Sequence, residues 1–188
     1  MNRLIVFLLL LMSVTLAAAQ SRTASGVASQ RMTREERKAA RAMEEEKRAR
    51  EVAALLNDTL FVLEADRLSG KDGMATVVNP GLNFIALSKG RMVIQTGSDL
   101  EFGPNGLGGT TITGRLTSFA TETNKKGYTR IKGNFQGSTA RNYRLDLSIS
   151  PSGNAVGRIT DIKGDYLEYR GRIKSVEDAR VFEGVTVF

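Results

Sequence analysis

NFIALSKGRMVIQT, residues 83–96, is the stretch that decides the fold. Two apolar runs flank the short turn Ser-Lys-Gly, and this pattern predicts a β-hairpin. Phe84 and Ile94 occupy one set of alternate positions, and Leu87 and Val93 belong to the other. Both faces of the hairpin should therefore be buried, so a second layer must cover one of them.

The cover that the sequence predicts is the end of a helix that precedes the hairpin. Thr-Arg-Glu-Glu at residues 33–36 has the spacing of a capping box, and strong helix formers follow it. We therefore expect one long charged helix over residues 33–57. Its apolar side chains gather only near the end, at Val52, Leu55 and Leu56. We expect these three side chains to lie across the hairpin.

The rest of the chain consists of short alternating runs separated by turns that contain glycine. This pattern is typical of antiparallel β structure, and the runs leave no room for crossover helices. Residues 58–188 are therefore expected to form one mainly β domain, a meander of about eight or nine antiparallel strands. The pattern is compatible with both a barrel-like domain and a sandwich.

Charged and apolar side chains alternate along the last of these runs, YLEYRGRI at residues 166–173. Such alternation indicates a strand with one buried face and one wet face. The wet face would carry Glu168, Arg170 and Arg172. We interpret this arginine-rich stripe as a solvated face with cross-strand ion pairs rather than as a ligand clamp.

The first 19 residues have the three parts of a secretory signal peptide. A positive charge at Arg3 precedes an uninterrupted apolar run, and Ala17 to Ala19 form an Ala-x-Ala cleavage pattern. We expect cleavage after Ala19 and a flexible linker, rich in Ser, Ala and Gly, over residues 20–32. No later run is long enough to span a membrane, and there is no cysteine for a disulfide or a lipid anchor. The expected location is the periplasm or the exterior.

Composition excludes many kinds of chemistry. The chain has no histidine and no cysteine, which removes nucleophile–histidine arrangements, thiol mechanisms and ordinary zinc or haem sites. It also has no tryptophan and only 6% aromatic residues, so it lacks the platforms beside which a glycosidase carboxylate pair would act. We expect no enzymatic activity and no cofactor.

The sequence also indicates which partners to expect. The formal net charge of +7 is spread along the chain instead of forming a basic tail, so nucleic acid is not an expected partner. Asp99, Glu101 and Asn105 carry oxygens that suit calcium, but their spacing does not match an EF-hand and a surface turn explains the same residues. No metal site is expected.

A glycine-rich loop, GPNGLGGT at residues 103–110, comes close to a phosphate-binding signature. Gly109 stands where the lysine is required, and an alternating strand follows instead of a helix. The stronger explanation is conformational, because these glycines tolerate positive φ, a bulge or a close backbone contact. The alternative is a ligand-binding loop on a rigid β scaffold, with Asn105, Gly106, Gly108 and Gly109 as candidates.

Three motifs resemble a known family. They are FVLEAD at residues 61–66, FGPNGLGGTTITG at residues 102–114, and EYRGRI at residues 168–173 followed by VFEG at residues 181–184. In this order they are similar to a family of exported Bacteroidota proteins known only as a domain of unknown function, number forty-two fifty-one. The resemblance covers nearly the whole mature chain. It implies the compartment and the fold, and it implies no activity, substrate or site.

These observations predict an exported, non-enzymatic β domain on a helical extension. It would act as a binding or envelope-associated interaction module, with an envelope protein as its partner. The alternative is a lipocalin-like carrier of a small apolar molecule, since eight or nine meandering strands can close around a ligand. An open apolar interior would favour the carrier, and a packed interior would favour the interaction module.

Overall fold

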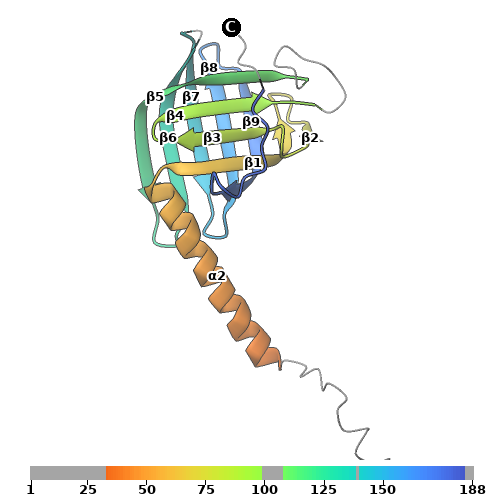
Figure 1. The fold of residues 1–188 in the computed structure, drawn as a ribbon, viewed down its shortest axis with the longest axis vertical. Helices are drawn as coiled ribbons and strands as arrows, with labels where there is room; N and C mark the ends of the chain where they lie inside the picture. The colour runs from red at the N-terminus through yellow and green to blue at the C-terminus, as the bar shows by residue number, and fades with distance from the viewer. Residues whose placement is uncertain (1–32, 99–107, 139, 185–188) are drawn as a thin grey trace, which may run out of the picture. The chain divides into compact units, whose positions relative to one another are not determined.

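A computed structural model describes residues 33–98, 108–138 and 140–184. The described residues divide into two units within the helix, one up to Ala40 and one from Arg41 onward. One helix, α2, precedes nine strands in chain order (Figure 1). The elements are α2 (Arg34–Asn57), β1 (Leu60–Ser69), β2 (Ala75–Val77), β3 (Phe84–Ser88), β4 (Arg91–Thr96), β5 (Thr110–Thr123), β6 (Thr129–Gly137), β7 (Asn142–Ile149), β8 (Asn154–Asp161) and β9 (Tyr166–Lys174).

The strands form a closed antiparallel barrel. From β3 onward each strand pairs with the next along the chain, and β9 returns to pair with β1. This pairing closes a ring of eight strands, β1 and β3 to β9. The ninth strand, β2, adds to the ring by pairing with the end of β1. Within the described residues, the predicted mainly β meander after one helix is confirmed, and of the two predicted architectures the barrel is the one that forms.

Helix α2 begins at the predicted capping box. The Thr33 backbone N–H donates to the Glu36 carboxylate at 2.7 Å, and the Glu36 N–H donates to the Thr33 hydroxyl at 3.2 Å. These two bonds satisfy donors that the first turn of a helix leaves without an intrahelical partner. Ion pairs one turn apart, such as Arg50 with Glu46 at 2.5 Å, follow on exposed surface.

Val52 and Leu56 are buried, as expected, but they do not cover the outside of the hairpin. They join the cluster of side chains that fills the inside of the barrel. The prediction that they lie across the second face of the hairpin was wrong. A helix that leads directly into β1 at Leu60 reaches the open end of the barrel, where apolar interior side chains are available to it.

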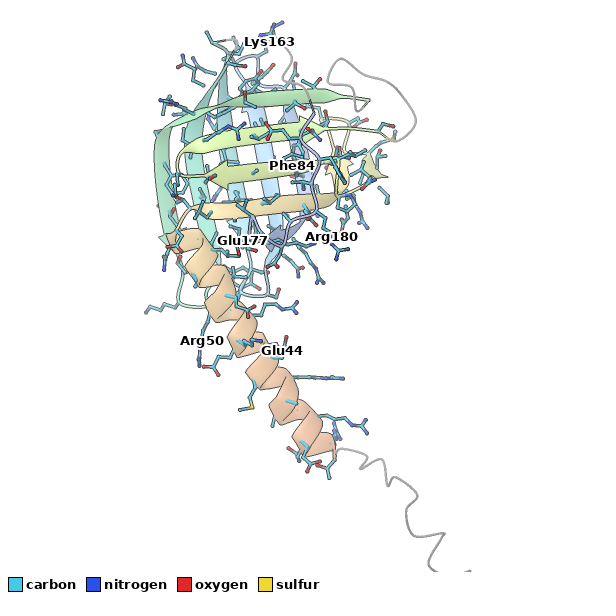
Figure 2. The ribbon with its side chains drawn as sticks, in the orientation of Figure 1. Glu44, Arg50, Phe84, Lys163, Glu177 and Arg180 are labelled. Carbon is cyan, nitrogen blue, oxygen red and sulfur yellow. The ribbon has the colours of Figure 1, made fainter. Side chains whose placement is uncertain are left out.

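The second face of the hairpin is covered by the segment that follows β9. Val62, Phe84 and Val93 form a separate cluster outside the barrel, against which Ala179 and Val181 pack. In Figure 1 this dark blue segment crosses β1, β3 and β4, and Figure 2 labels Phe84 on β3 and Arg180 on the segment. We name residues 175–184 the C-terminal strap.

Buried polar groups hold the C-terminal strap in place. The Gln95 side chain, which has no exposed surface, donates to the Phe182 carbonyl at 2.7 Å and accepts from the Gly184 N–H at 2.7 Å. Glu64 accepts from the Arg180 N–H at 2.8 Å. Because an unpaired buried polar group is costly, these bonds select one position of the strap on the hairpin.

Two side chains of the hairpin, Phe84 and Ile94, do not share a face as the sequence predicted. Ile94 pairs with Ile85 and faces the interior, whereas Phe84 pairs with Gln95 and faces the strap. Phe84 and Ile94 therefore lie on opposite faces, although their spacing along the chain put them together. The turn at Lys89 and Gly90 lies between the two paired strands and sets this register, with φ of 48° and 85°.

Candidate functional site

The barrel interior is the first candidate site, and it is filled by side chains. Tyr169, Phe61 and Phe135 are among the large residues with less than 2% of their surface exposed, together with the aliphatic side chains of the interior cluster. Side chains also meet across the barrel. A Cβ added to Gly157 on β8 would lie 2.8 Å from Cδ1 of Ile85 on β3. The glycine leaves room for a side chain from another wall of the barrel.

The second candidate is the glycine-rich loop, of which the structure describes one end. Asn105 and Gly106 lie outside the described residues. Gly108 and Gly109 lie directly before β5, and Gly108 has a φ of 70°. A Cβ added to Gly109 would overlap the carbonyl oxygen of Thr96 at the end of β4. The backbone conformation of Gly108 and the close approach at Gly109 therefore both favour glycine over residues with a side chain. Their role in binding stays a prediction.

Alanine at either glycine should lower stability. We expect Gly109→Ala and Gly108→Ala each to reduce the free energy of unfolding by about 1–2 kcal/mol, because the first adds an overlap and the second places a Cβ at positive φ. Thermal melts of the purified variants measure this. Melts of both variants that superimpose on the parent curve would contradict the conformational explanation.

The outer face of the barrel is the third candidate, and it contains the predicted cross-strand ion pairs. Arg130 on β6 contacts Asp146 on β7 at 2.5 Å. Glu168 on β9 accepts from Arg158 on β8 at 2.9 Å and from Arg170 on its own strand at 2.8 Å. The interpretation of this stripe as a face with cross-strand ion pairs is therefore correct for these residues.

The pKa values of the two carboxyl groups follow from these contacts. The hydrogen bond from Arg130 lowers the pKa of Asp146. Burial acts to raise the pKa of Glu168, but hydrogen bonds from Arg158 and Arg170 outweigh it and leave this pKa below its ordinary value. Both carboxylates are thus ionised at neutral pH, Asp146 paired with one arginine and Glu168 shared by two.

Two arginines close to these pairs are not balanced. Arg67 on β1 and Arg172 on β9 form no ion pair among the described residues of the chain. Glu64 is the cross-strand neighbour of Arg172, but its carboxylate contacts Lys174 at 2.7 Å and accepts from the Arg180 N–H. The C-terminal strap and Lys174 thus take up the carboxylate that would otherwise neutralise Arg172.

A β-bulge brings the unbalanced Arg67 beside Arg170. The register of β1 against β9 runs from Ala65 opposite Gly171 to Arg67 opposite Arg170, so Asp66 has no partner on β9. Without this bulge Asp66 would stand opposite Arg170, but Arg67 would then stand opposite Tyr169, whose side chain is buried inside the barrel. With the bulge, two like charges are direct cross-strand neighbours, an arrangement that destabilises a sheet.

These residues line a hollow of about 510 Å³ on the barrel wall, which we call the arginine depression. Three of its lining residues are Arg67, Arg170 and Arg172. Its volume lies within the range of about 300–1,000 Å³ that is usual for small-molecule sites. Its other lining residues are Asp66, Tyr128, Ser148, Ile149, Ser150, Asn154, Ala155, Val156 and Gly171.

Another hollow, of about 480 Å³, lies beside the end of α2. Leu55, Gly153 and Ile173 contribute to its lining. Two of its charged groups, Arg48 and Glu51, have partners one turn away on the helix, at 3.7 Å and 3.9 Å. Lys174, which also lines this hollow, contacts Glu64, and Arg172 lines both hollows. Among the described residues, this hollow therefore has no arginine without an ion pair beyond the one that it shares with the arginine depression.

Sequence reasoning identified the arginine-rich stripe but missed the depression. Arg170 and Arg172 were placed on the wet face of the last strand, whereas Arg67 lies about a hundred residues earlier, on the first strand. No pattern within either strand signals their meeting. Asp66 and Arg67 place charges at two successive positions and so interrupt the alternation where the bulge forms, but they do not indicate which strand lies opposite.

Two kinds of site find no support in the described part of the chain. Residues 33–98, 108–138 and 140–184 contain no group of three or more carboxylates that could hold a metal ion. Among the same residues, no helix is long and apolar enough to cross a membrane.

Taken together, fold and surface define a closed antiparallel β-barrel with a filled interior and a basic depression on its wall. The family model of the domain of unknown function DUF4251 matches residues 43–173, so the chain belongs to the DUF4251 family. It is similar to a crystal structure of a DUF4251 family protein from Bacteroides eggerthii DSM 20697, with 24% identity and a TM-score of 0.61. The match covers 73% of this chain and 93% of that chain, and it supports the fold alone. No curated protein matches the chain.

Proposed function

We propose that this protein is an exported, non-enzymatic binding module that engages its ligand or partner with the outer wall of the barrel. The observation that carries the proposal is the filled interior, in which Ile85 reaches the backbone of Gly157 from another strand of the barrel. A carrier needs an enclosed space for its cargo. The interior side chains occupy that space, which supports binding at the surface over a lipocalin-like role.

The absence of a catalytic function is part of the same proposal. Catalytic acids and bases usually show pKa values shifted by burial or by a neighbouring like charge. The carboxyl groups of Asp146 and Glu168, on the outer face of the barrel, have lowered pKa values and contact arginines. They are suited to holding charge on the surface and not to exchanging a proton near neutral pH. The chain also contains no histidine and no cysteine.

Export is proposed from the sequence of the first 19 residues. The location is the periplasm or the exterior of the cell, with association to the envelope through a bound partner and not through a membrane span. We infer that a mature chain starting at Gln20 presents its basic wall to molecules of the envelope.

One experiment tests location and mode of binding together. The full chain, expressed in a Gram-negative host, should be recovered from the periplasmic or external fraction with Gln20 at its N-terminus, as read by mass spectrometry. The purified mature chain should then show no saturable binding of a fluorescent fatty acid at micromolar concentration. Recovery of the protein from the cytoplasm with residues 1–19 still attached would contradict export. Stoichiometric binding of the fatty acid would support the carrier function instead.

A further inference from the structure

We propose that the arginine depression binds an acidic sugar residue, with Arg67 and Arg172 on its carboxylate and the neutral lining groups on its hydroxyls. This inference rests on the proposed function, because a module that binds with its outer wall needs a site on that wall. It adds the ligand class and the residues that recognise it.

Unbalanced positive charge is the first reason. Of the three arginines in the depression, only Arg170 has a carboxylate partner, Glu168, among the described residues. Arg67 and Arg172 are exposed to solvent and their guanidinium groups have donors to spare. Asp66 is the one acidic residue in the lining. An anion between Arg67 and Arg172 would receive charge-assisted hydrogen bonds from both.

The bulge at Asp66 is the second reason. It places Arg67 on the outer wall opposite Arg170 and returns Leu68 to the interior opposite Tyr169. A bulge can re-aim a side chain in this way, and here it adds Arg67 to the wall that carries Arg170 and Arg172. A bound carboxylate would offset the charge of Arg67, which has no carboxylate partner among the described residues.

The neutral part of the lining is the third reason, and it favours a sugar over a bare anion. Tyr128 is 53% exposed and Val156 is half-buried, so the depression offers apolar surface beside the charges. Ser148 and Asn154 provide a hydroxyl and an amide in the same hollow. A sugar ring has an apolar face for the ring of Tyr128 and hydroxyls for these polar groups, whereas an inorganic anion would use neither.

The geometry of arginine suits the carboxylate of an acidic sugar. Guanidinium groups present two parallel N–H donors that match two oxygens of a carboxylate or of a phosphate, and the neutral lining of the depression favours the sugar acid. Arg172 lies on β9 between Asn154 and Glu64 in the register, and Arg67 lies on β1 opposite Arg170. Both strands are paired on both sides, so the two backbone positions are fixed relative to one another before a ligand arrives.

The test uses the mature chain and three probes in calorimetric titrations at constant ionic strength. The probes are a disaccharide that contains glucuronate, its neutral glucose counterpart, and inorganic phosphate. We expect saturable binding of the glucuronate disaccharide, at least tenfold weaker binding of the neutral disaccharide, and weaker binding of phosphate. Absence of glucuronate binding would overturn the proposal, and so would equal binding of either other probe.

Variants assign the binding to the depression. Arg172→Gln and Arg67→Gln should each weaken binding of the glucuronate disaccharide about tenfold, and Arg172→Lys should weaken it less because the charge remains. The matched control is Arg144→Gln, since Arg144 is an exposed arginine on the outer face of β7 and lies outside the depression. It removes the same charge and should leave binding unchanged.

If Arg144→Gln weakens glucuronate binding as much as Arg172→Gln does, the attraction is a nonspecific effect of a basic protein, and the proposed site is wrong. Thermal melts establish that each variant is folded, and Arg172→Lys keeps the test decisive if Arg172→Gln unfolds. Failure of this inference is distinguishable from failure of the proposed function. If the protein is exported and binds neither the fatty acid nor the glucuronate disaccharide, the proposed function stands and only the proposed ligand class is wrong.

Discussion

Replacing Gly171 by alanine should reduce the free energy of unfolding by about 3 kcal/mol or more, the largest effect expected for any glycine that the structure describes. Gly171 lies in β9 where that strand closes the barrel against β1. An added Cβ would overlap the carbonyl oxygen of Glu64 and would lie 2.8 Å from Cα of Ala65. Both obstructing atoms belong to the backbone, so no rotation of a side chain can relieve the overlap.

The surroundings of Gly171 explain why the effect exceeds that at the glycine-rich loop. Gly171 is paired on one side with Ala65 and on the other with Ala155. Moving β9 away from β1 to admit a methyl group would therefore break hydrogen bonds on the closing seam of the barrel. Gly109, by contrast, precedes the first paired residue of β5, where the backbone can shift at lower cost.

Thermal and urea-induced unfolding of Gly171→Ala measure the effect. Gly70→Ala is the matched control, because the nearest atom to its added Cβ is the side-chain oxygen of Asp72 at an ordinary 3.6 Å. We expect the control to change stability by less than about 0.5 kcal/mol. Equal stability of the two variants would show that β9 can move away from β1 at little cost in free energy.

Phe135→Ala should cost about 3–5 kcal/mol and leave an apolar cavity inside the barrel. The Phe135 side chain has no exposed surface, and its ring lies 5.8 Å from the ring of Tyr143 on the neighbouring strand. Removing it deletes its contact with Tyr143 and its packing within the interior cluster. Because an engineered apolar cavity can take up small apolar molecules, the variant should bind benzene, which stabilises it, whereas the parent should not.

Phe119→Ala is the control for this variant, since Phe119 is 39% exposed and its truncation should cost less than about 1 kcal/mol. Chemical unfolding gives the stability of each protein, and thermal melts with and without benzene give the binding. A Phe135→Ala variant as stable as the parent would mean that the interior is loosely packed. That result would remove the observation on which surface binding is proposed.

Local patterns in the sequence were sufficient for the elements and for the general architecture. The capping box at Thr33 and Glu36 depends on residues three positions apart, and the alternation along β6 to β9 depends on every second residue. Both are properties of neighbouring residues, so they can be recognised without the fold. Nine short strands without crossover helices then leave an antiparallel meander as the expected topology.

The site residues were only partly predictable from the sequence. Gly108 and Gly109 were recognised as positions that require glycine, and the positive φ of Gly108 and the close carbonyl of Thr96 supply the reason. Asn105 and Gly106 lie outside the described residues, so their predicted role stays open to experiment. The stripe of Arg170 and Arg172 was recognised as wet, but its meeting with Arg67 was not.

Tertiary structure alone decided the barrel, the cover of the hairpin and the arginine depression. Closure pairs β1 with β9, strands separated by about a hundred residues. The second face of the hairpin receives the C-terminal strap, which has no periodic pattern, and the end of α2 enters the interior instead. The depression depends on a one-residue bulge at Asp66 in the closing seam. In each case the deciding free energy comes from contacts between distant segments, which form only after the chain has closed on itself, so no local pattern of residues can encode them.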